Sequence, residues 1–124
     1  MEAAIGKKSQ AKNTETLKRG DIYWVNLNPT VGTEINKTRP GLIVSNDVAS
    51  QFARILLIAP ITSKNTEIIR PFEVVVSIKG KQSKILLNQC RAVDKSRLQT
   101  KIGSADAATM MLVDEAIKIA FGLH

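Results

Sequence analysis

Several residue types on which enzymes commonly depend are almost absent from this sequence of 124 residues. The one cysteine, Cys90, excludes an internal disulfide bond and any zinc site built from several thiolates. The one histidine, His124, is the last residue, so a Ser-His-Asp triad or a His-based metal site does not fit the chain. Metal sites built from thiolate or imidazole ligands are therefore excluded. We expect no cofactor.

Long apolar runs and aromatic side chains are also scarce. No apolar stretch approaches the ~20 residues that a transmembrane helix needs, and the first residues lack the apolar core of a signal peptide. We therefore expect a cytoplasmic protein that does not contact a membrane. Aromatic residues make up 4% of the chain, which argues against a nucleic-acid binder built mainly on stacking platforms.

Positive charge, by contrast, is in excess. The chain has 18 Lys and Arg against 11 Asp and Glu, which gives a formal net charge of +7. This balance favours a polyanionic partner, either a nucleic acid or an acidic protein segment. Residues 1–18 are polar and lack hydrophobic periodicity, so we predict a flexible basic extension there and one domain over residues 19–124.

Most of that domain has the pattern of β-structure, with short β-branched runs between turn residues. The expected strands cover residues 22–27, 42–44, 55–59, 72–78 and a segment that begins at 85–87. Pro60 is expected to end the third strand and to open a loop over residues 61–70, and Gly80 marks a hairpin turn.

Only the C-terminal part has helical spacing. Ser104 is a candidate N-cap and Gly122 a candidate stop. One apolar stripe is formed by Leu112, Val113, Ala116, Ile117 and Ala120. The fold class is therefore mainly β (α+β): a small, partly open SH3-like barrel of about six short strands with a C-terminal α-helix.

The polar loop over residues 28–40 is the most informative stretch, because it is too long for a hairpin turn and carries Glu34, Lys37 and Arg39. By composition alone, a solvated loop without a specific role is the simpler interpretation. Against it, Pro40 favours an extended backbone at Arg39, which fixes this side chain better than a loop tip does.

Two further polar clusters follow strands. Residues 60–64 place Thr62 and Ser63 at the rim of the barrel, although local hydroxyl-to-backbone bonds are the simpler role for Ser63. Residues 88–98 contain Gln89, which is in a position to face a groove.

The order and spacing of these segments resemble the MazF/PemK family of bacterial toxin endoribonucleases. The likeness covers about residues 19–123, and the segments that carry it are 19–34, 38–47, 59–63 and 87–98. The resemblance implies an SH3-like barrel, a homodimer, and metal-independent, sequence-selective cleavage of single-stranded RNA by attack of the 2′-OH. It also implies a MazE-like antitoxin whose acidic, disordered segment covers the RNA groove, with DNA contacted only through that antitoxin.

The resemblance also assigns site residues. Arg39 matches the family's catalytic arginine, Thr62 its catalytic threonine, and Glu34 an acidic residue that some members need. The residues expected to contact RNA around them are Asn36, Lys37, Thr38, Ser63, Lys64, Arg70 and Gln89. The family often has a Gly before its Arg-Pro pair, where this chain has residues 35–38, so we expect a stiffer loop and a different RNA preference.

The chemistry of these side chains agrees with that assignment. The planar guanidinium of Arg39 suits two phosphate oxygens, and the Thr62 hydroxyl can donate one more hydrogen bond to the phosphate. Glu34 is the only carboxylate near either residue in sequence, which makes it the candidate base. The lack of an internal histidine predicts a slow enzyme that relies on positioning.

Two alternatives stay open at this stage. A non-enzymatic CcdB-like toxin of the same fold would bind DNA gyrase through a C-terminal Trp-Gly-Ile, where this chain ends in Phe121-Gly-Leu-His124. An SH3-like binding module without activity would also satisfy the composition. Trp24 is expected in the core or an interface, and Cys90 as a small buried hydrophobe.

Overall fold

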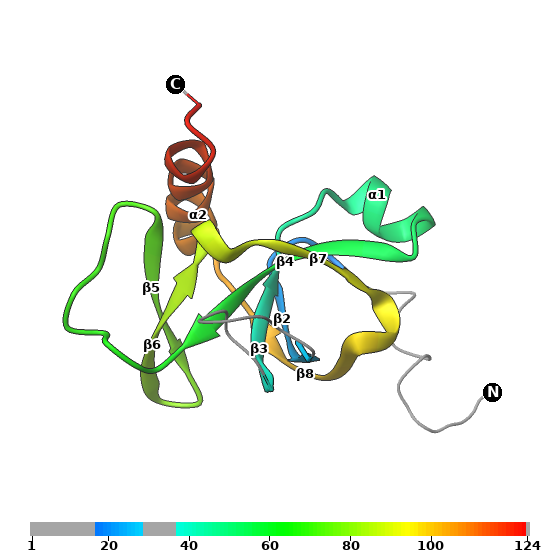
Figure 1. The fold of residues 1–124 in the computed structure, drawn as a ribbon, viewed down its shortest axis with the longest axis horizontal. Helices are drawn as coiled ribbons and strands as arrows, with labels where there is room; N and C mark the ends of the chain where they lie inside the picture. Colours follow the sequence, from blue (N-terminus) through cyan, green and yellow to red (C-terminus); the bar gives the residue numbers. More distant parts are fainter. Residues whose placement is uncertain (1–16, 29–36, 124) are drawn as a thin grey trace.

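The computed structural model of the protein describes residues 17–28 and 37–123. These residues form one curled antiparallel sheet with the C-terminal helix packed against it (Figure 1). The strands are β2 (Asp21–Asn26), β3 (Thr38–Ile43), β4 (Ile55–Thr62), β5 (Glu73–Ile78), β6 (Lys81–Leu86), β7 (Arg91–Asp94) and β8 (Leu98–Ser104). The helices are α1 (Asp47–Phe52) and α2 (Ala107–Ala120), with single 3₁₀ turns at η2 (Leu87–Gln89) and η3 (Lys95–Arg97).

The strand order is β5-β6-β4-β3-β2-β8, and β7 pairs with β4 beside this path. The two ends of the order, β5 and β8, do not pair with each other among the described strands, so the barrel is open. The expected fold class is confirmed, with seven described strands where about six were expected.

Strand β4 is longer than expected because it changes partners along its length. Its first half, Ile55 to Ile58, pairs with β7, and Ile61 and Thr62 pair with β6. Pro60 lies between these two stretches, where β4 has no partner on that side and a residue without an N–H is tolerated. The expectations that Pro60 ends the strand and that residue 61 begins a loop are therefore wrong.

The β5–β6 hairpin closes through a two-residue turn. Lys79 and Gly80 have φ values of +52° and +79°, as a type I′ turn requires, and Ile78 pairs with Lys81 across it. Strand β6 therefore begins at Lys81 and not at the apolar run from Ile85. The first half of β6 is polar, so a search for apolar runs does not identify it as a strand.

The chain enters helix α2 later than expected. Ser104 is the last residue of β8, and its Oγ donates a hydrogen bond to Asp21 Oδ1 at 2.9 Å. The N-cap is Asp106, whose carboxylate accepts the Thr109 N–H at 2.8 Å. Gly122 follows the end of α2 with a φ of +73°, so the expected stop is confirmed. A second, short helix, α1, begins at Asp47, where only a turn was expected.

Apolar side chains form two core clusters on the two faces of the sheet. Neighbouring residues such as Leu42 and Ile43 belong to different clusters, because successive side chains of a strand point to opposite faces. The α2-side cluster contains Ile22, Leu42, Ala59, Ile61, Val74, Ile78, Ile85, Leu87, Val113 and Ala116. The opposite cluster contains Leu17, Tyr23, Val25, Leu27, Ile43, Leu56, Ile58, Val93 and Leu98.

Two details of this packing differ from the expected core. Leu17, which the sequence pattern placed in the extension, is buried in the opposite cluster. Leu112 is 60% exposed, so the buried stripe of α2 consists of Val113 and Ala116, flanked by the partly buried Ile117 and Ala120. Among the described residues no helix is long and apolar enough to cross a membrane.

Candidate active site

Strands β3 and β4 bring Arg39 and Thr62 to the same end of the sheet. The paired residues are Ile43 with Ile58, Leu42 with Ala59, and Gly41 with Pro60. Extended by two residues, this register sets Arg39 opposite Thr62. Because the side-chain period of a strand is two, both residues belong to the face that carries the opposite cluster.

Further strands extend this arrangement on both sides. Arg39 is paired with Val25 of β2, and Thr62 is paired with Lys84 of β6. On the extended register, Lys84, Thr62, Arg39 and Val25 lie in one row across four strands, which we call the Arg39–Thr62 row. The structure therefore places at the same end of the sheet two residues that are 23 positions apart in the sequence.

Thr62 is buried, with 6% of its surface exposed. Its Oγ1 accepts the backbone N–H of Lys64 at 3.1 Å. This bond occupies an acceptor lone pair and fixes the position of the oxygen, and the hydroxyl proton is not consumed by it. The hydroxyl therefore remains able to donate one hydrogen bond.

A buried ion pair lies beside Thr62. Lys84 Nζ and Glu73 Oε1 are 3.0 Å apart, and both side chains are 7% exposed. Lys84 Nζ also donates to the Ile68 carbonyl at 3.0 Å, and Glu73 Oε1 accepts the Arg70 N–H at 3.0 Å. These bonds tie the loop between β4 and β5 to the sheet.

The charge of Glu73 is stabilised by the same contacts. Burial raises the pKa of its carboxyl, but the hydrogen bond from the Arg70 N–H and the hydrogen bond and charge of Lys84 lower it more. The net result is a lowered pKa, so Glu73 is an anion at neutral pH. The sequence analysis missed this pair, because Glu73 and Lys84 are eleven residues apart on strands whose register was unknown.

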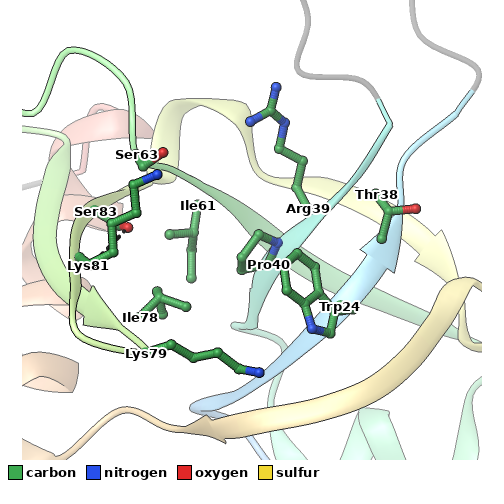
Figure 2. A pocket seen from close by; sticks show the side chains of 10 residues that line it. All are labelled: Trp24, Thr38, Arg39, Pro40, Ile61, Ser63, Ile78, Lys79, Lys81 and Ser83. Carbon is green, nitrogen blue, oxygen red and sulfur yellow. Dashed lines mark hydrogen bonds between the residues drawn. The ribbon is translucent and has the colours of Figure 1, made fainter.

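On the other face of β3 and β4 the sheet opens into a pocket of about 320 Å³ (Figure 2). Its lining residues are Trp24, Thr38, Arg39, Pro40, Ile61, Ser63, Ile78, Lys79, Lys81 and Ser83. Three of these side chains are cationic, and none of the described residues that line the pocket is acidic. We call it the Trp24 pocket.

The residues predicted to bind RNA divide into three groups. Thr38 and Ser63 line the Trp24 pocket together with Arg39. Lys37, Lys64 and Arg70 are exposed and Gln89 is partly buried, and none of these four lines the pocket. Glu34 and Asn36 lie outside the described residues.

Lysines of the β5–β6 hairpin are the residues that the sequence analysis missed. Lys79 and Lys81 flank Gly80, and Ser83 follows on the same face of β6 as Lys81. The hairpin turn predicted at Gly80 places both lysines near its tip, but the sequence does not show that this tip lies beside β2 and β3. Trp24 was also assigned to a core or interface, but it is partly exposed and lines this pocket.

Two arginines donate hydrogen bonds to backbone carbonyls at the end of β2, where the polar loop begins. Arg91 Nη1 donates to the Leu27 carbonyl at 3.1 Å, and Arg97 Nη1 donates to the Asn26 carbonyl at 3.1 Å and also to that of Asn28. Across the base of the loop, Lys37 N donates to Asn28 Oδ1 at 2.9 Å. These hydrogen bonds therefore fix the two residues that flank the loop, Asn28 and Lys37.

Among the described residues, no three His, Cys, Asp or Glu side chains are grouped as a metal site requires.

The protein is thus a small open β-barrel with a C-terminal helix, and it carries an arginine and a threonine at one end of the sheet, beside a pocket lined by cationic side chains. The model of the PemK-like, MazF-like toxins of type II toxin–antitoxin systems matches residues 18–121, and the chain belongs to this family.

Two relatives are similar over almost their whole length. The chain is 38% identical over 111 residues to endoribonuclease EndoA of Bacillus subtilis (strain 168), covering 86% of this chain and 96% of the relative. It is 34% identical over 112 residues to endoribonuclease MazF of Staphylococcus epidermidis, covering 87% and 93% of the two chains.

Solved structures agree with the fold. The crystal structure of MazF from Deinococcus radiodurans has a TM-score of 0.75 at 26% identity and covers 86% of this chain and 97% of that one. A mycobacterial endoribonuclease in complex with its cognate antitoxin has a TM-score of 0.74 at 21% identity, over 87% and 97% of the chains. The second likeness is evidence of the fold alone.

Proposed function

We propose that this protein is a toxin that cleaves single-stranded RNA at selected sequences, without a metal ion and by attack of the substrate's own 2′-OH. The observation that carries the proposal is the Arg39–Thr62 row, in which the extended β3–β4 register sets Arg39 opposite Thr62, whose hydroxyl oxygen is fixed by the Lys64 N–H. Membership of the family and relatives named as endoribonucleases support the activity. These names also favour RNA cleavage over the gyrase-binding alternative.

In the proposed reaction, the 2′ oxygen forms a bond to the neighbouring phosphorus and loses its proton. The P–O5′ bond then breaks, and the 5′ oxygen takes up a proton, which leaves a 2′,3′-cyclic phosphate and a 5′-hydroxyl. No protein nucleophile is needed. The task of the protein is to hold the reacting atoms in line and to stabilise the charge that grows on the phosphorane.

Arg39 and Thr62 have different parts in this step. The planar guanidinium of Arg39 donates two parallel hydrogen bonds to the non-bridging oxygens of the phosphate. The Thr62 hydroxyl donates one further bond to the same group. Glu34 stays the candidate base for the 2′-OH proton, as a prediction from sequence.

We also infer that the toxin is a homodimer in the cytoplasm that is neutralised by a MazE-like antitoxin, with DNA reached only through that antitoxin. The support for a second copy is the apolar surface of α2 and the residues after it. Exposed there are Met111, Leu112, Ile119, Phe121 and Leu123. We expect light scattering at micromolar concentration to give twice the chain mass of 13.6 kDa, and a particle of 13.6 kDa would contradict the dimer.

The activity is tested by incubating the purified protein with a long RNA in EDTA and mapping the ends by primer extension. We expect discrete cuts, cyclic phosphate termini, and no cleavage of an RNA that carries a single 2′-deoxynucleotide at the mapped site. Cleavage that needs added Mg²⁺, or that survives the 2′-deoxy substitution, would overturn the mechanism. Intact RNA together with inhibition of gyrase supercoiling would favour the CcdB-like alternative.

A further inference from the structure

We propose that the buried Glu73–Lys84 pair positions Thr62 for the reaction, by fixing the loop whose Lys64 N–H holds the Thr62 hydroxyl oxygen. The inference rests on the proposed function insofar as Thr62 donates to the phosphate. It makes Glu73 and Lys84 positioning residues, which act through Thr62 and not on the RNA.

The orientation of Thr62 depends on the loop over residues 63–72, which joins β4 to β5 and forms a wide arc at the edge of the sheet (Figure 1). Thr62 Oγ1 accepts the Lys64 N–H at 3.1 Å, and this donor lies only two residues further along the chain. Such a local bond fixes the side-chain rotamer only as well as the backbone that supplies the N–H is itself fixed. The direction in which Thr62 can donate is therefore set by the position of the Lys64 peptide.

Apolar packing does little to hold this loop. Among residues 63–70 none is buried, and only Thr66 is partly buried. Ile68 and Ile69 are 54% and 39% exposed. A backbone bond inside the loop, from the Ile68 N–H to the Asn65 carbonyl, is 3.5 Å long, outside the usual range of about 2.7–3.2 Å. Contacts from outside the loop are therefore needed to keep it in one conformation.

The Glu73–Lys84 pair supplies such contacts. Lys84 Nζ donates to the Ile68 carbonyl at 3.0 Å and lies 3.0 Å from Glu73 Oε1. The same Oε1 accepts the Arg70 N–H at 3.0 Å, and the Glu73 N–H donates to the Arg70 carbonyl at 2.9 Å. Two buried side chains therefore hold the loop at two points, Ile68 and Arg70.

The pair also lies directly beside Thr62 in the sheet, because Lys84 is the cross-strand partner of Thr62 in the β4–β6 ladder. The contacts described above form a closed ring that begins and ends at this ladder pair, through Lys64, Asn65 and Ile68. Asn65 allows the chain to turn within the ring, because its φ of +55° is tolerated by Asn better than by most residues. A displacement of the pair is therefore passed to the Thr62 hydroxyl through few bonds.

Stability alone explains a charged pair at this place poorly. Replacing a buried ion pair by apolar side chains of similar volume is often neutral or stabilising. Apolar side chains cannot, however, accept the Arg70 N–H or donate to the Ile68 carbonyl. The charged pair therefore supplies the fixed direction of these bonds to the loop, which an apolar pair would not.

Two variants separate the position of the loop from the stability of the fold. Lys84→Met with Glu73→Leu leaves no buried charge, so the fold is kept, but the bonds to the loop are lost. We expect single-turnover cleavage in EDTA to slow by about 10- to 100-fold, because a displacement of about 1 Å can cost 10²-fold in rate. RNA affinity should fall much less than the rate.

Glu73→Gln is the converse variant. It keeps an acceptor oxygen for both bonds but leaves the Lys84 charge buried without a counter-ion. We expect it to unfold at a lower urea concentration than the wild type and yet to cleave at a rate near that of the wild type.

The double change Lys84→Met with Glu73→Leu is then made in a Thr62→Val background, in which no hydroxyl remains to be oriented. If the pair acts through Thr62, the further loss of rate there should be less than about twofold, because both changes remove the same contribution. Arg54→Met is the control, because it removes a largely exposed ion pair with Asp94 at the other end of β4. It should leave the rate unchanged.

The rotamer of Thr62 is measured without any cleavage by NMR of protein labelled at its threonine methyl groups, with Thr62→Val to assign the signal. Three-bond couplings to the methyl carbon should show one χ1 rotamer in the wild type and in Glu73→Gln, and averaging in the double variant. A wild type that cuts no RNA would contradict the proposed function, and these couplings would still decide whether the pair positions Thr62.

Three results would overturn the inference. One is a folded double variant that cleaves at the wild-type rate. Another is an equal loss of rate on removing the pair in the wild-type and the Thr62→Val backgrounds. The third is a single, unchanged Thr62 rotamer in the double variant, which would leave the pair with a purely structural role.

Discussion

Arg39 lies at the open end of β3, two residues beyond the last paired position with β4, and its proposed task depends on the shape of its cation. A residue that only holds the ground-state phosphate can be replaced by Lys, because the charge is kept. A residue that stabilises the phosphorane cannot be replaced by Lys, because the ammonium group of Lys does not make two parallel hydrogen bonds.

We therefore predict that Arg39→Lys lowers the cleavage rate by about 10²–10³, the usual cost of losing one donor at a developing oxyanion, with RNA affinity little changed. Thr62→Ser should keep most of the activity because the hydroxyl remains, and Thr62→Val should lose less than Arg39→Lys because it removes a neutral donor. The measurement is single-turnover cleavage of a short RNA with enzyme in excess and EDTA present. Cleavage by Arg39→Lys at a rate near wild type would restrict Arg39 to binding.

Cys90 is predicted to be an unreactive thiol. It packs against the α2-side cluster, and burial raises the pKa of its thiol to about 11. Because the thiolate is the nucleophile, we expect alkylation by iodoacetamide at pH 8 to be much slower in the folded protein than in urea, and to accelerate as the pH approaches 11. Equal rates in the folded and the unfolded protein at pH 8 would contradict this.

At the scale of elements, the Glu73–Lys84 pair holds the loop after β4 against β5 and β6. Removing one partner leaves the other charge buried without a counter-ion, which costs about 3–5 kcal/mol in comparable buried pairs. We predict a loss of this size in the free energy of unfolding for Lys84→Met. The double variant Lys84→Met with Glu73→Leu should recover most of the loss, because it leaves no buried charge.

Urea denaturation gives both numbers, and its pH dependence gives a second readout. The folded-state pKa of Glu73 is lowered, so its stabilisation is complete above the unfolded pKa near 4.5 and is lost as the pH falls through the folded pKa. The stability of the wild type should therefore fall more steeply below about pH 4.5 than that of the double variant. A double variant as unstable as Lys84→Met would show that the pair is not the cause.

Much of this element structure follows from local pattern. The apolar alternation identifies the cores of β2, β3, β4 and β5, and the helical spacing identifies α2. Strand β6 was only half identified because its first four residues are Lys, Gln, Ser and Lys, and strand β4 was cut short at Pro60. Both errors concern strand pairing, which a local hydrophobic pattern does not report: the polar half of β6 pairs with β5, and β4 changes partners around Pro60.

The candidate site, too, could be predicted only in part from the sequence. Arg39 and Thr62 were identified from motifs, but their placement across the β3–β4 register depends on strand pairing. The Trp24 pocket joins β2, β3, β4 and the β5–β6 hairpin, so its lysines carry no signal at short sequence distance. A Trp in a strand is usually buried, whereas Trp24 is partly exposed and lines the pocket between the hairpin and β3.

For the whole molecule, the net charge of +7 and the cations near the site predict binding that depends strongly on salt. If Arg39, Lys64, Lys79 and Lys81 each contact one phosphate, the slope of log K against log salt for a single strand is about −3. Equilibrium binding of an uncleavable RNA between low and physiological salt measures this slope. A slope near zero would mean that these cations are not the binding surface.

The pleat of β3 and β4 has a consequence for how toxins of this kind can diversify. Adjacent residues of these strands lie on opposite faces, so substitutions in the Trp24 pocket and at its two-residue hairpin tip can leave Arg39 and Thr62 in place. On the proposed function, a few surface substitutions can then change the RNA sequence that the toxin selects, while the residues of the cleavage step and the core stay the same.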